Sequence, residues 1–498
     1  MMRYVLGMVV LLGGLVPVLG QERNPFLIQS EKFDAEYRQQ LEDLSQKMVK
    51  NTKAAARIRS HCKVPHADDS MYVWKLPAKM RKATTVKKKS SAKVSPDKKR
   101  LDQFNDLKEE ASLFYLALSR KAVKAGHASL GFGFLMRALR ENPDNAAARK
   151  ILGYKKYQDM WLSDFEIAQY KAGKTNHDRF GWIPKGHVSK YEEGQRFYRG
   201  RWISEAQDAS FHADILSGWE IETPHYVITT NHSIEAGVQI GRELEKLYAV
   251  WKQLFLRYYA TEKQVAALFE GKPGLSTPMG KHKVFFFRSQ TDYNRYLKPT
   301  NPNIEISLGL YSTNTHVAYF FAGENYDPRT MFHEATHQLF QEIRKTDQAA
   351  GRLGNFWTIE GIAVTMETFR EEDQYYAVGG FNDQRMLSAR YRYNKTKFHL
   401  PLEQLAGMTT EQFQSFPKLG DLYSESAGWM NFFIFHEDGK YRDAIAQVLL
   451  DVYTGKNTFD TIPRYTGRSY EKLEEEYREF ITHDVKELDR WRFGDGEE

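Results

Sequence analysis

The N-terminal third of the chain shows the three- and four-residue spacing of apolar side chains that is typical of helices. Residues 31–59 predict one amphipathic helix, whose apolar face is formed by Phe33, Tyr37, Leu41, Leu44 and Met48. A second helical pattern covers residues 101–157 and is interrupted at Gly126 and at the turn Asn142-Pro143-Asp144-Asn145. We therefore expect a helical N-terminal region.

The pattern changes near Trp219, where short apolar runs begin to alternate with helical periodicity. Three of these runs predict β-strands, at residues 225–230, 283–289 and 316–322. Ser233 can cap a long helix that continues to Tyr258, and a short helix is expected at residues 293–297. This order of elements predicts an α+β fold that is mainly helical and contains a small mixed β-sheet.

The first 20 residues have the composition of a signal peptide. Arg3 precedes an apolar run, and the small residue Gly20 stands at a suitable position for cleavage before Gln21. The run is too short for a membrane-spanning helix, and no later stretch is long enough, so we expect no transmembrane segment in the mature chain. Cys62 is the only cysteine, which excludes an intramolecular disulfide. An exported chain without disulfides suggests a secreted or periplasmic protein of a bacterium.

Positive charge is concentrated in one low-complexity stretch. The chain has a formal net charge of +7, and residues 81–100 carry +8 of it, which leaves −1 for all other residues. A nearly neutral body argues against a nucleic-acid partner. The stretch is rich in Lys and Ser and has no aromatic residue, so we expect a solvated linker after a helical N-terminal segment at residues 21–80. Attachment to a partner in the cell envelope is the alternative.

A weak internal repeat lies in residues 101–160. Leu118-Ser119 and Leu152-Gly153 are 34 positions apart, which is the period of tetratricopeptide repeats. Because one such unit cannot bury its own apolar face, we expect a tetratricopeptide-like helical hairpin that packs on its neighbours, with peptide or envelope-partner binding as the alternative. Residues 161–215 follow as a small Trp- and Gly-rich connecting region, in which Arg199-Gly200 could turn a hairpin.

Candidate chemistry appears in the stretch MFHEATHQLF, residues 331–340. Its His-Glu-x-x-His pattern puts His333 and His337 on one face of a helix, because residues four apart are neighbours on a helix surface. Asp327 and Pro328 are suited to the start of this helix. With one cysteine in the chain, a metal would be held by histidine and carboxylate, and two histidines with this spacing suit zinc.

The third ligand distinguishes between families of metallopeptidases. Position 343 is Ile343, whereas the metzincin pattern requires a histidine there. The motif His333-Glu334-x-x-His337, followed by Trp357-x-x-Glu360-Gly361-x-Ala363, resembles the gluzincin zinc metallopeptidases. The resemblance is greatest to the peptidase-MA-like domains of uncharacterised secreted bacterial proteins.

This resemblance implies a gluzincin-like metallopeptidase domain over residues 216–498. In such a domain one Zn²⁺ ion is bound by His333, His337 and Glu360. Glu334 is then the general base that takes a proton from a metal-activated water during peptide hydrolysis. Glu367 lies on the same helical face as Glu360 and is an alternative ligand, or a residue that orients a ligand without binding the metal.

Three further features bear on substrate and mechanism. The position of Tyr423 resembles that of the oxyanion-stabilising tyrosine of related gluzincins, although a core aromatic residue is the alternative. Residues 316–322 resemble the edge strand along which gluzincin substrates lie. The Gly-Ala-Met-Glu-Asn element of the aminopeptidase branch is reduced here to Ala322-Gly323-Glu324-Asn325. We therefore expect an exported zinc endopeptidase with a peptide or protein substrate. The alternative is a non-catalytic binding or scaffolding protein of the cell envelope, built on a degenerate peptidase domain.

Overall fold

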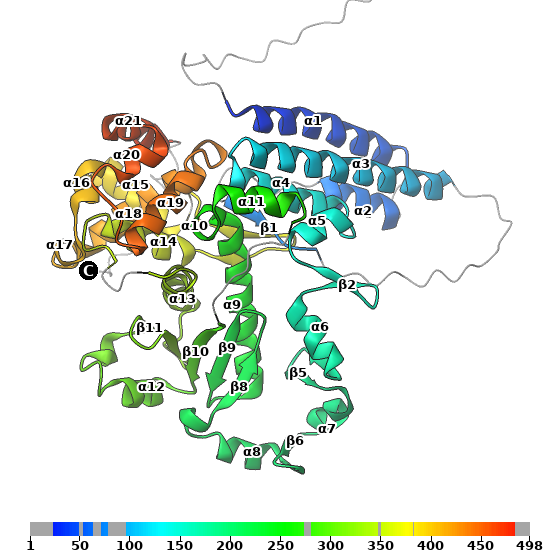
Figure 1. The fold of residues 1–498 in the computed structure, drawn as a ribbon, viewed down its shortest axis with the longest axis vertical. Helices are drawn as coiled ribbons and strands as arrows, with labels where there is room; N and C mark the ends of the chain where they lie inside the picture. The colour runs from blue at the N-terminus through cyan, green and yellow to red at the C-terminus, as the bar shows by residue number, and fades with distance from the viewer. Residues whose placement is uncertain are drawn as a thin grey trace, which may run out of the picture.

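The computed structural model describes residues 23–48, 53–62, 71–77, 96–272, 280–346, 350–381 and 383–483. Helices dominate, and the strands form small sheets, which confirms a mainly helical α+β fold (Figure 1). The predicted signal peptide and most of the basic linker lie outside the described residues. Among the described residues, no helix has the length and apolar character needed to cross a bilayer.

The N-terminal region is helical, as predicted, but with different boundaries. The helix expected over residues 31–59 is two helices, α1 (Pro25–Gln46) and α2 (Lys53–Cys62). The start of α1 is earlier than expected because the Asn24 side chain accepts a hydrogen bond from the Phe26 amide and Pro25 occupies the first helical position. Further helices are α3 (Pro96–Lys124), α4 (Ala128–Glu141) and α5 (Ala146–Ile151).

Helices α3 and α4 form a tightly packed hairpin. Gly126, with φ +90°, occupies the turn, where a side chain would be strained. A Cβ on Gly131 would overlap Val123 and the Ser119 carbonyl, so only glycine allows this close approach of the two helices. Phe33 of α1 stacks on Phe114 of α3 with 3.8 Å between ring centroids. The hairpin thus packs on a neighbouring helix, while its tetratricopeptide character stays a prediction.

Residues 155–211 form three successive units, each a β-hairpin followed by a helix. Their elements are β2 (Lys155–Tyr157), β3 (Met160–Leu162) and α6 (Asp164–Lys171); β4 (Lys174–His177), β5 (Gly181–Pro184), η1 (Lys185–His187) and α7 (Val188–Glu192); and β6 (Gln195–Tyr198), β7 (Arg201–Ser204) and α8 (Glu205–Phe211). Trp161, Trp182 and Trp202 occupy equivalent positions in the second strands. Figure 1 shows these units as an arc at the lower right. The Arg199-Gly200 turn predicted the hairpin of β6 and β7, whereas the threefold repeat of the unit was not predicted.

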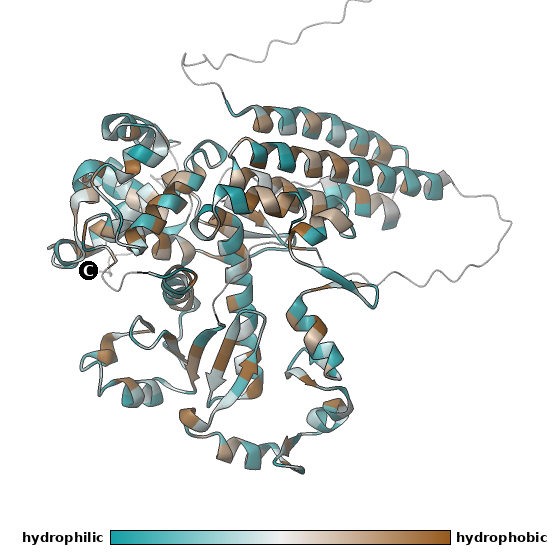
Figure 2. Cartoon of the chain, viewed as in Figure 1, coloured by the Kyte–Doolittle hydropathy of each residue, from teal (hydrophilic) through white to brown (hydrophobic). Residues whose placement is uncertain are grey.

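The main sheet has five strands in the order β11-β12-β10-β9-β8. The strands are β8 (Trp219–Glu222), β9 (Tyr226–Thr230), β10 (His282–Phe287), β11 (Leu310–Ser312) and β12 (Val317–Phe321). The three inner strands are parallel, and the two outer strands are antiparallel to their neighbours. All three predicted strands are present. In Figure 2 the strands of this sheet are largely brown, whereas α1 and α3 mix brown and teal residues, as expected for amphipathic helices.

The assignment of residues 316–322 to the sheet edge was wrong. Strand β12 pairs with β10 on one side and with β11 on the other, so β11 is the outer strand. All five residues of β12 are buried, in agreement with an inner position. Strand β11 has only three residues, too few to produce a hydrophobic alternation that a sequence pattern could reveal.

Helices surround the sheet and join its strands. Ser233 caps α9 (Ile234–Leu254), and the helix expected to reach Tyr258 is broken at Phe255 before the short α10 (Leu256–Tyr259). The remaining connections are α11 (Glu262–Phe269), the expected short helix α12 (Gln290–Leu297), and the 3-10 turns η2 (Ile215–Ser217) and η3 (Ile304–Ile306).

The motif helices α13 (Pro328–Glu342) and α14 (Phe356–Met366) lead from the sheet into the C-terminal helices. Every residue of α14 is buried, and a Cβ on Gly361 would collide with the Ser426 carbonyl of α18, so this glycine lets the two helices touch. The elements beyond α14 are β13 (Arg370–Glu371), β14 (Tyr375–Val378), α15 (Gln384–Tyr391), the π-helix η4 (Arg392–Thr396), α16 (Leu402–Gly407), α17 (Thr410–Gln414), α18 (Leu419–Phe435), η5 (His436–Asp438), α19 (Arg442–Tyr453), α20 (Thr461–Thr466) and α21 (Tyr470–Ile481).

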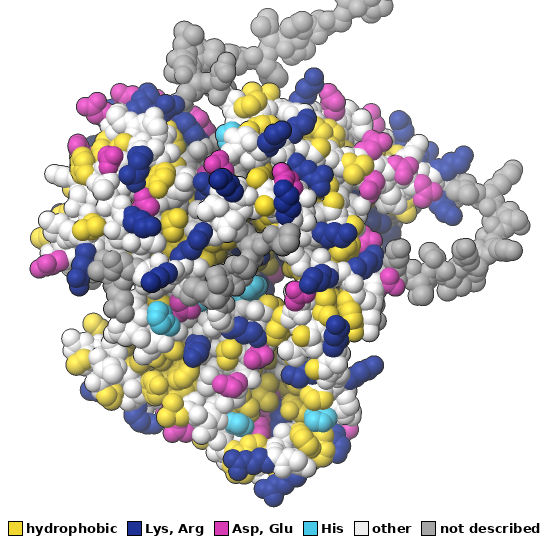
Figure 3. Space-filling view, viewed as in Figure 1, with side chains coloured by type: hydrophobic (Ala, Val, Ile, Leu, Met, Phe, Trp, Pro, Cys, Tyr) yellow, Lys and Arg dark blue, Asp and Glu magenta, His cyan; other side chains and the backbone are white. Residues whose placement is uncertain are grey.

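The N-terminal region is also joined to this C-terminal part by a strand. β1 (Met71–Trp74) pairs antiparallel with β14, and Lys75 beside it forms an ion pair with Glu371 of β13 at 2.7 Å. Helix α4 packs against α9, α10 and α19 as well. Charged side chains of both signs are distributed over both parts on the face in Figure 3. The two parts therefore share one packed core.

Candidate metal centre

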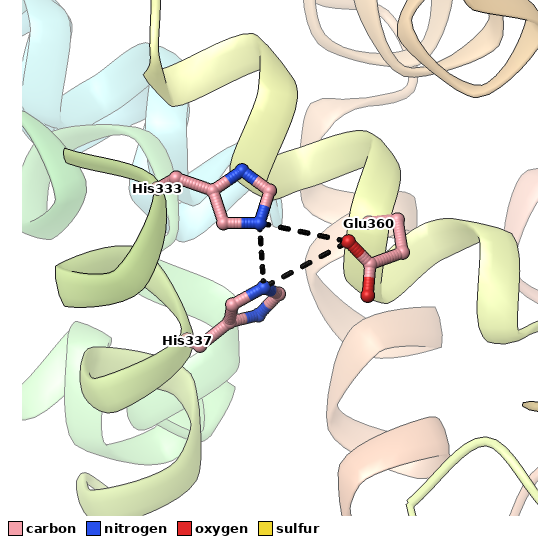
Figure 4. Close-up of side chains that lie close together, drawn as sticks. All are labelled: His333, His337 and Glu360. Atoms are coloured by element: carbon pink, nitrogen blue, oxygen red, sulfur yellow. Dashed lines mark hydrogen bonds and ion pairs between the residues drawn. The ribbon is translucent and has the colours of Figure 1, made fainter. Parts of the chain in front are cut away.

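Helix α13 carries the two histidines of the motif. Asp327 caps the helix by accepting a hydrogen bond from the Arg329 amide, and Pro328 takes the first position, as the sequence indicated. The side chains of His333 and His337 leave the same face one turn apart, and their Nε2 atoms are 3.0 Å from each other. Both imidazoles are thus oriented toward a common point (Figure 4).

Glu360 reaches the same point from helix α14. Its Oε2 lies 3.6 Å from Nε2 of His333 and 3.9 Å from Nε2 of His337. The Glu360 residue is only 8% exposed, because α14 is enclosed by α13 and α18. The close approach at Gly361 fixes the depth of α14, and with it the position of the neighbouring Glu360.

The donor atoms fit a zinc ion. Zinc ligands lie about 2.1 Å from the ion in tetrahedral geometry, so neighbouring donor atoms should be about 3.4 Å apart. The three observed separations, from 3.0 to 3.9 Å, bracket this value. Among the described residues, no other group of His, Cys, Asp and Glu brings three such atoms within 4.8 Å of one another. Three protein ligands also match the number found in catalytic zinc sites, which keep a fourth position for water or substrate.

The electrostatics of the site agree with a cation at its centre. Burial lowers the pKa of His337 to about 4, so its ring is neutral and can offer a lone pair. Burial opposes ionisation of Glu360, but its hydrogen bond to His333 and the nearby imidazoles outweigh this and lower its pKa. Burial also opposes protonation of His333, yet hydrogen bonds to Glu360 and Glu367 raise its pKa to about 10.

Glu367 contacts the other side of the His333 ring. Its Oε1 lies 2.7 Å from Nδ1 of His333, whereas the cluster uses Nε2. Nε and Nη2 of Arg385 are both 2.9 Å from Oε2 of Glu367. A carboxylate on the remaining nitrogen fixes the tautomer and the orientation of a metal-binding histidine. Of the two roles considered for Glu367, the geometry supports orientation rather than ligation.

Glu334 is held beside the cluster by strand β11. Its Oε2 accepts a hydrogen bond of 2.8 Å from the backbone N–H of Tyr311. Burial raises the pKa of Glu334 to about 7, against the opposing effect of His333. The carboxyl group can therefore both accept and release a proton near neutral pH, as a general base must.

Tyr423 of α18 lies against Glu360. The Tyr423 hydroxyl interacts with the Glu360 carboxylate, and burial raises the pKa of Tyr423. The tyrosine is therefore neutral and can donate a hydrogen bond at the cluster. Its ring also packs on Phe413, which agrees with the alternative of a core aromatic residue. A role in oxyanion stabilisation stays a prediction.

Two residues of this site were not predicted from the sequence. Arg385 reaches Glu367 only because the β13–β14 hairpin brings the start of α15 back to the end of α14. Tyr311 contributes a backbone N–H, which no side-chain pattern reveals. Asp383, which caps α15, marks the start of that helix in the sequence, but it does not indicate that Arg385 contacts Glu367.

No family model matches this chain, and no curated protein matches it either. The resemblance to gluzincins therefore rests on the two motifs. The functional assignment depends on the geometry and chemistry of the cluster itself.

Proposed function

We propose that the protein is an exported zinc-dependent peptidase that hydrolyses peptide bonds. The observation that carries the proposal is the convergence of His333, His337 and Glu360 on one point, with the ionisable carboxyl group of Glu334 next to them on α13. A ligand set of two histidines and one glutamate, with a glutamate following the first histidine, is the combination used by zinc peptidases of this motif class.

Three residues would hold the metal ion, and a fourth would transfer the proton. Zinc held by His333, His337 and Glu360 would lower the pKa of a bound water and polarise a peptide carbonyl. Glu334 accepts a proton on its carboxylate and returns it to the leaving amine, since its pKa lies near neutrality. The Tyr311 N–H fixes the orientation of Glu334. Glu367 and Arg385 keep the His333 ring in place.

Strand β11 is the structural basis for a peptide substrate. It is the outer strand of the sheet, and its Tyr311 lies at the site through the contact with Glu334. An extended peptide can pair with such an edge through backbone groups that the sheet does not use, apart from the Tyr311 N–H, which donates to Glu334. Recognition along an extended chain suits an endopeptidase.

The test separates zinc binding from hydrolysis. Mature protein is loaded with zinc, and its cleavage of a peptide library is measured with and without a chelator. We expect Glu334→Gln to retain one zinc ion and to lose cleavage by about 10²–10⁴-fold, because a general base contributes about that much. His232→Ala is the matched control, since His232 is exposed and far from the motif in sequence.

Two results would contradict the proposal. Unchanged cleavage in the Glu334→Gln variant would exclude its role as base. Stoichiometric zinc without cleavage of any library member would instead favour the non-catalytic scaffolding function. Export is tested separately, by N-terminal sequencing of the mature protein, for which we expect Gln21 as the first residue.

A further inference from the structure

A cavity of about 430 Å³ lies between the N-terminal helices and the C-terminal part, away from the residues of the candidate metal centre. Helices α1 and α4 and strand β1 form one wall, and the end of α9, residues 380–381 and helices α15, α18, α19 and α21 form the other. Its volume is within the range of about 300–1,000 Å³ that small-molecule sites occupy. The N-terminal region thus supplies half of a possible binding site.

Slightly more than half of the cavity wall is apolar. Side chains from both parts contribute, among them Leu27, Phe134, Leu254, Phe381, Phe435 and Phe480. The buried polar residue Asn431 is already engaged, because its side chain donates to the Ala427 carbonyl and accepts from the Gly380 amide. Such a wall suits an alkyl chain better than a peptide, whose backbone groups would need new hydrogen-bond partners.

The acidic groups at the cavity have cationic partners. Asp34 forms an ion pair with Arg137 at 2.6 Å, and Glu31 accepts a hydrogen bond of 2.9 Å from Arg23. Arg23 also lies 3.7 Å from Asp438. Each carboxylate that lines the cavity therefore has a cationic partner.

Two guanidinium groups at the cavity have no ion-pair partner among the described residues. Arg38 and Arg442 line it, and neither forms an ion pair with a carboxylate of the described residues. Arg442 is the more enclosed of the two, and burial lowers the pKa of its guanidinium in spite of the opposing charges of Asp443 and Asp438. The three arginines that line the cavity equal the three lining carboxylates in number, and Arg442 is the enclosed guanidinium without an ion pair in the described part of the chain.

The backbone around Arg442 is shaped to hold its guanidinium. Its Nε donates to the Ile434 carbonyl at 3.1 Å, and Nη2 lies 3.5 Å from the Asp438 carbonyl. Gly439 has φ +91°, and a Cβ there would overlap the guanidinium. Two carbonyl contacts leave most of the five N–H donors of an arginine for another acceptor.

We propose that this cavity binds an amphipathic carboxylate, a molecule with a single alkyl chain and one carboxylate group. The Arg442 guanidinium binds the carboxylate, with which its planar donors can form paired hydrogen bonds. The alkyl chain occupies the space between Phe134 and Phe435.

Calorimetric titration of the full mature chain with dodecanoate, below its micelle concentration, tests the proposal. We expect saturable binding of one molecule, and binding about tenfold to hundredfold weaker in Arg442→Gln, the usual range for a lost charged hydrogen bond. Arg295→Gln is the matched control, because Arg295 lies on α12 with a side chain that is 72% exposed, and it should bind as the wild type does.

A second variant tests the location without removing a charge. Gly133 of α4 lines the cavity, and a Cβ there meets no atom within 4 Å. We expect Gly133→Phe to fold, since glycine is a poor helix former, and to abolish binding by filling the space. Unchanged binding in this variant would place the ligand elsewhere and overturn the proposal.

The chemistry of the ligand is tested with two further probes. Dodecanol should bind at least tenfold more weakly than dodecanoate, and equal binding would exclude a carboxylate site. A hydrophobic tripeptide with a free C-terminus should also bind more weakly, and tighter binding of the peptide would overturn the assignment of an alkyl chain. Because none of the metal-centre residues lines the cavity, His337→Ala should bind dodecanoate normally, even if the proposed peptidase function fails.

Discussion

Two partly buried clusters of histidine and glutamate in the described C-terminal half have opposite geometry. In the first, the Nε2 atoms of His333 and His337 and one oxygen of Glu360 converge on one point. In the second, His399 lies between two carboxylates, with Nδ1 2.8 Å from Glu425 and Nε2 2.9 Å from Glu474. The residue types are the same, yet only the first cluster has the arrangement of a metal site.

The two clusters differ in where their ring nitrogens and carboxylate oxygens point. His399 uses both ring nitrogens as donors to carboxylates; although burial opposes its charge, these hydrogen bonds raise its pKa to about 9. That cluster is complete as an imidazolium with its counter-ions. In the first cluster, ring nitrogens of two histidines and one carboxylate oxygen face a single point, so one cation there can contact all three atoms, whereas the two nitrogens of His399 face different carboxylates. Convergence of acceptors, rather than the number of His and Glu residues, therefore distinguishes the candidate metal centre from the His399 cluster.

The strongest test of this comparison removes one histidine from each cluster. His337→Ala should lose zinc binding and peptide cleavage, whereas His399→Gln should retain both. Zinc at about 100 times its dissociation constant should stabilise the wild type and His399→Gln by about 2.7 kcal/mol, and His337→Ala not at all. Urea unfolding with and without zinc measures this. Zinc-dependent stabilisation of the His337→Ala variant would show that the ligand assignment is wrong.

A smaller effect is expected from the carboxylate that orients His333. Glu367→Gln should weaken zinc binding by about 10–100-fold, because the outer hydrogen bond fixes the tautomer and the ring orientation of the ligand. Competition with a fluorescent chelator measures the affinity. Loss of all zinc binding would instead mean that Glu367 is itself a ligand.

The His399 cluster should be visible in the pH dependence of stability. Because the pKa of His399 in the folded state is about 9, above the ordinary histidine value of about 6.5, its stabilisation is complete below about pH 6.5 and is lost as the pH rises through 9. We expect a loss of about 1 kcal/mol, since the buried Glu425 offsets part of the gain. Urea unfolding below and above this pH window, on the wild type and on His399→Gln, measures it. An equal loss in both proteins would contradict the assignment.

The smallest effect is expected one step further from the metal. Arg385→Gln leaves Glu367 in contact with His333 but removes its partner, so we expect zinc affinity to fall less than in Glu367→Gln, by about tenfold at most. The same chelator competition measures this, with Arg295→Gln as the control at an exposed side chain. A larger loss than in Glu367→Gln would show that Arg385 acts on the metal centre by another route.

Much of the candidate site could be predicted because its signals are local. His333, Glu334 and His337 lie within one and a half turns of a helix whose cap is also in the sequence. Glu360 followed from the motif around Trp357. The contacts of Arg385 and Tyr311 could not be predicted, because they depend on how a hairpin and an outer strand fold back onto the motif helices.

The sequence by itself determined the helical and strand periodicity, the caps of α9 and α13, and the zinc-type motif, because these depend on neighbours within a few residues. Only the tertiary structure decided that β11 covers β12, that β1 pairs with β14, and that a cavity remains between α4 and α18. Such features arise from contacts between segments far apart in the chain, and no local pattern encodes which of them meet.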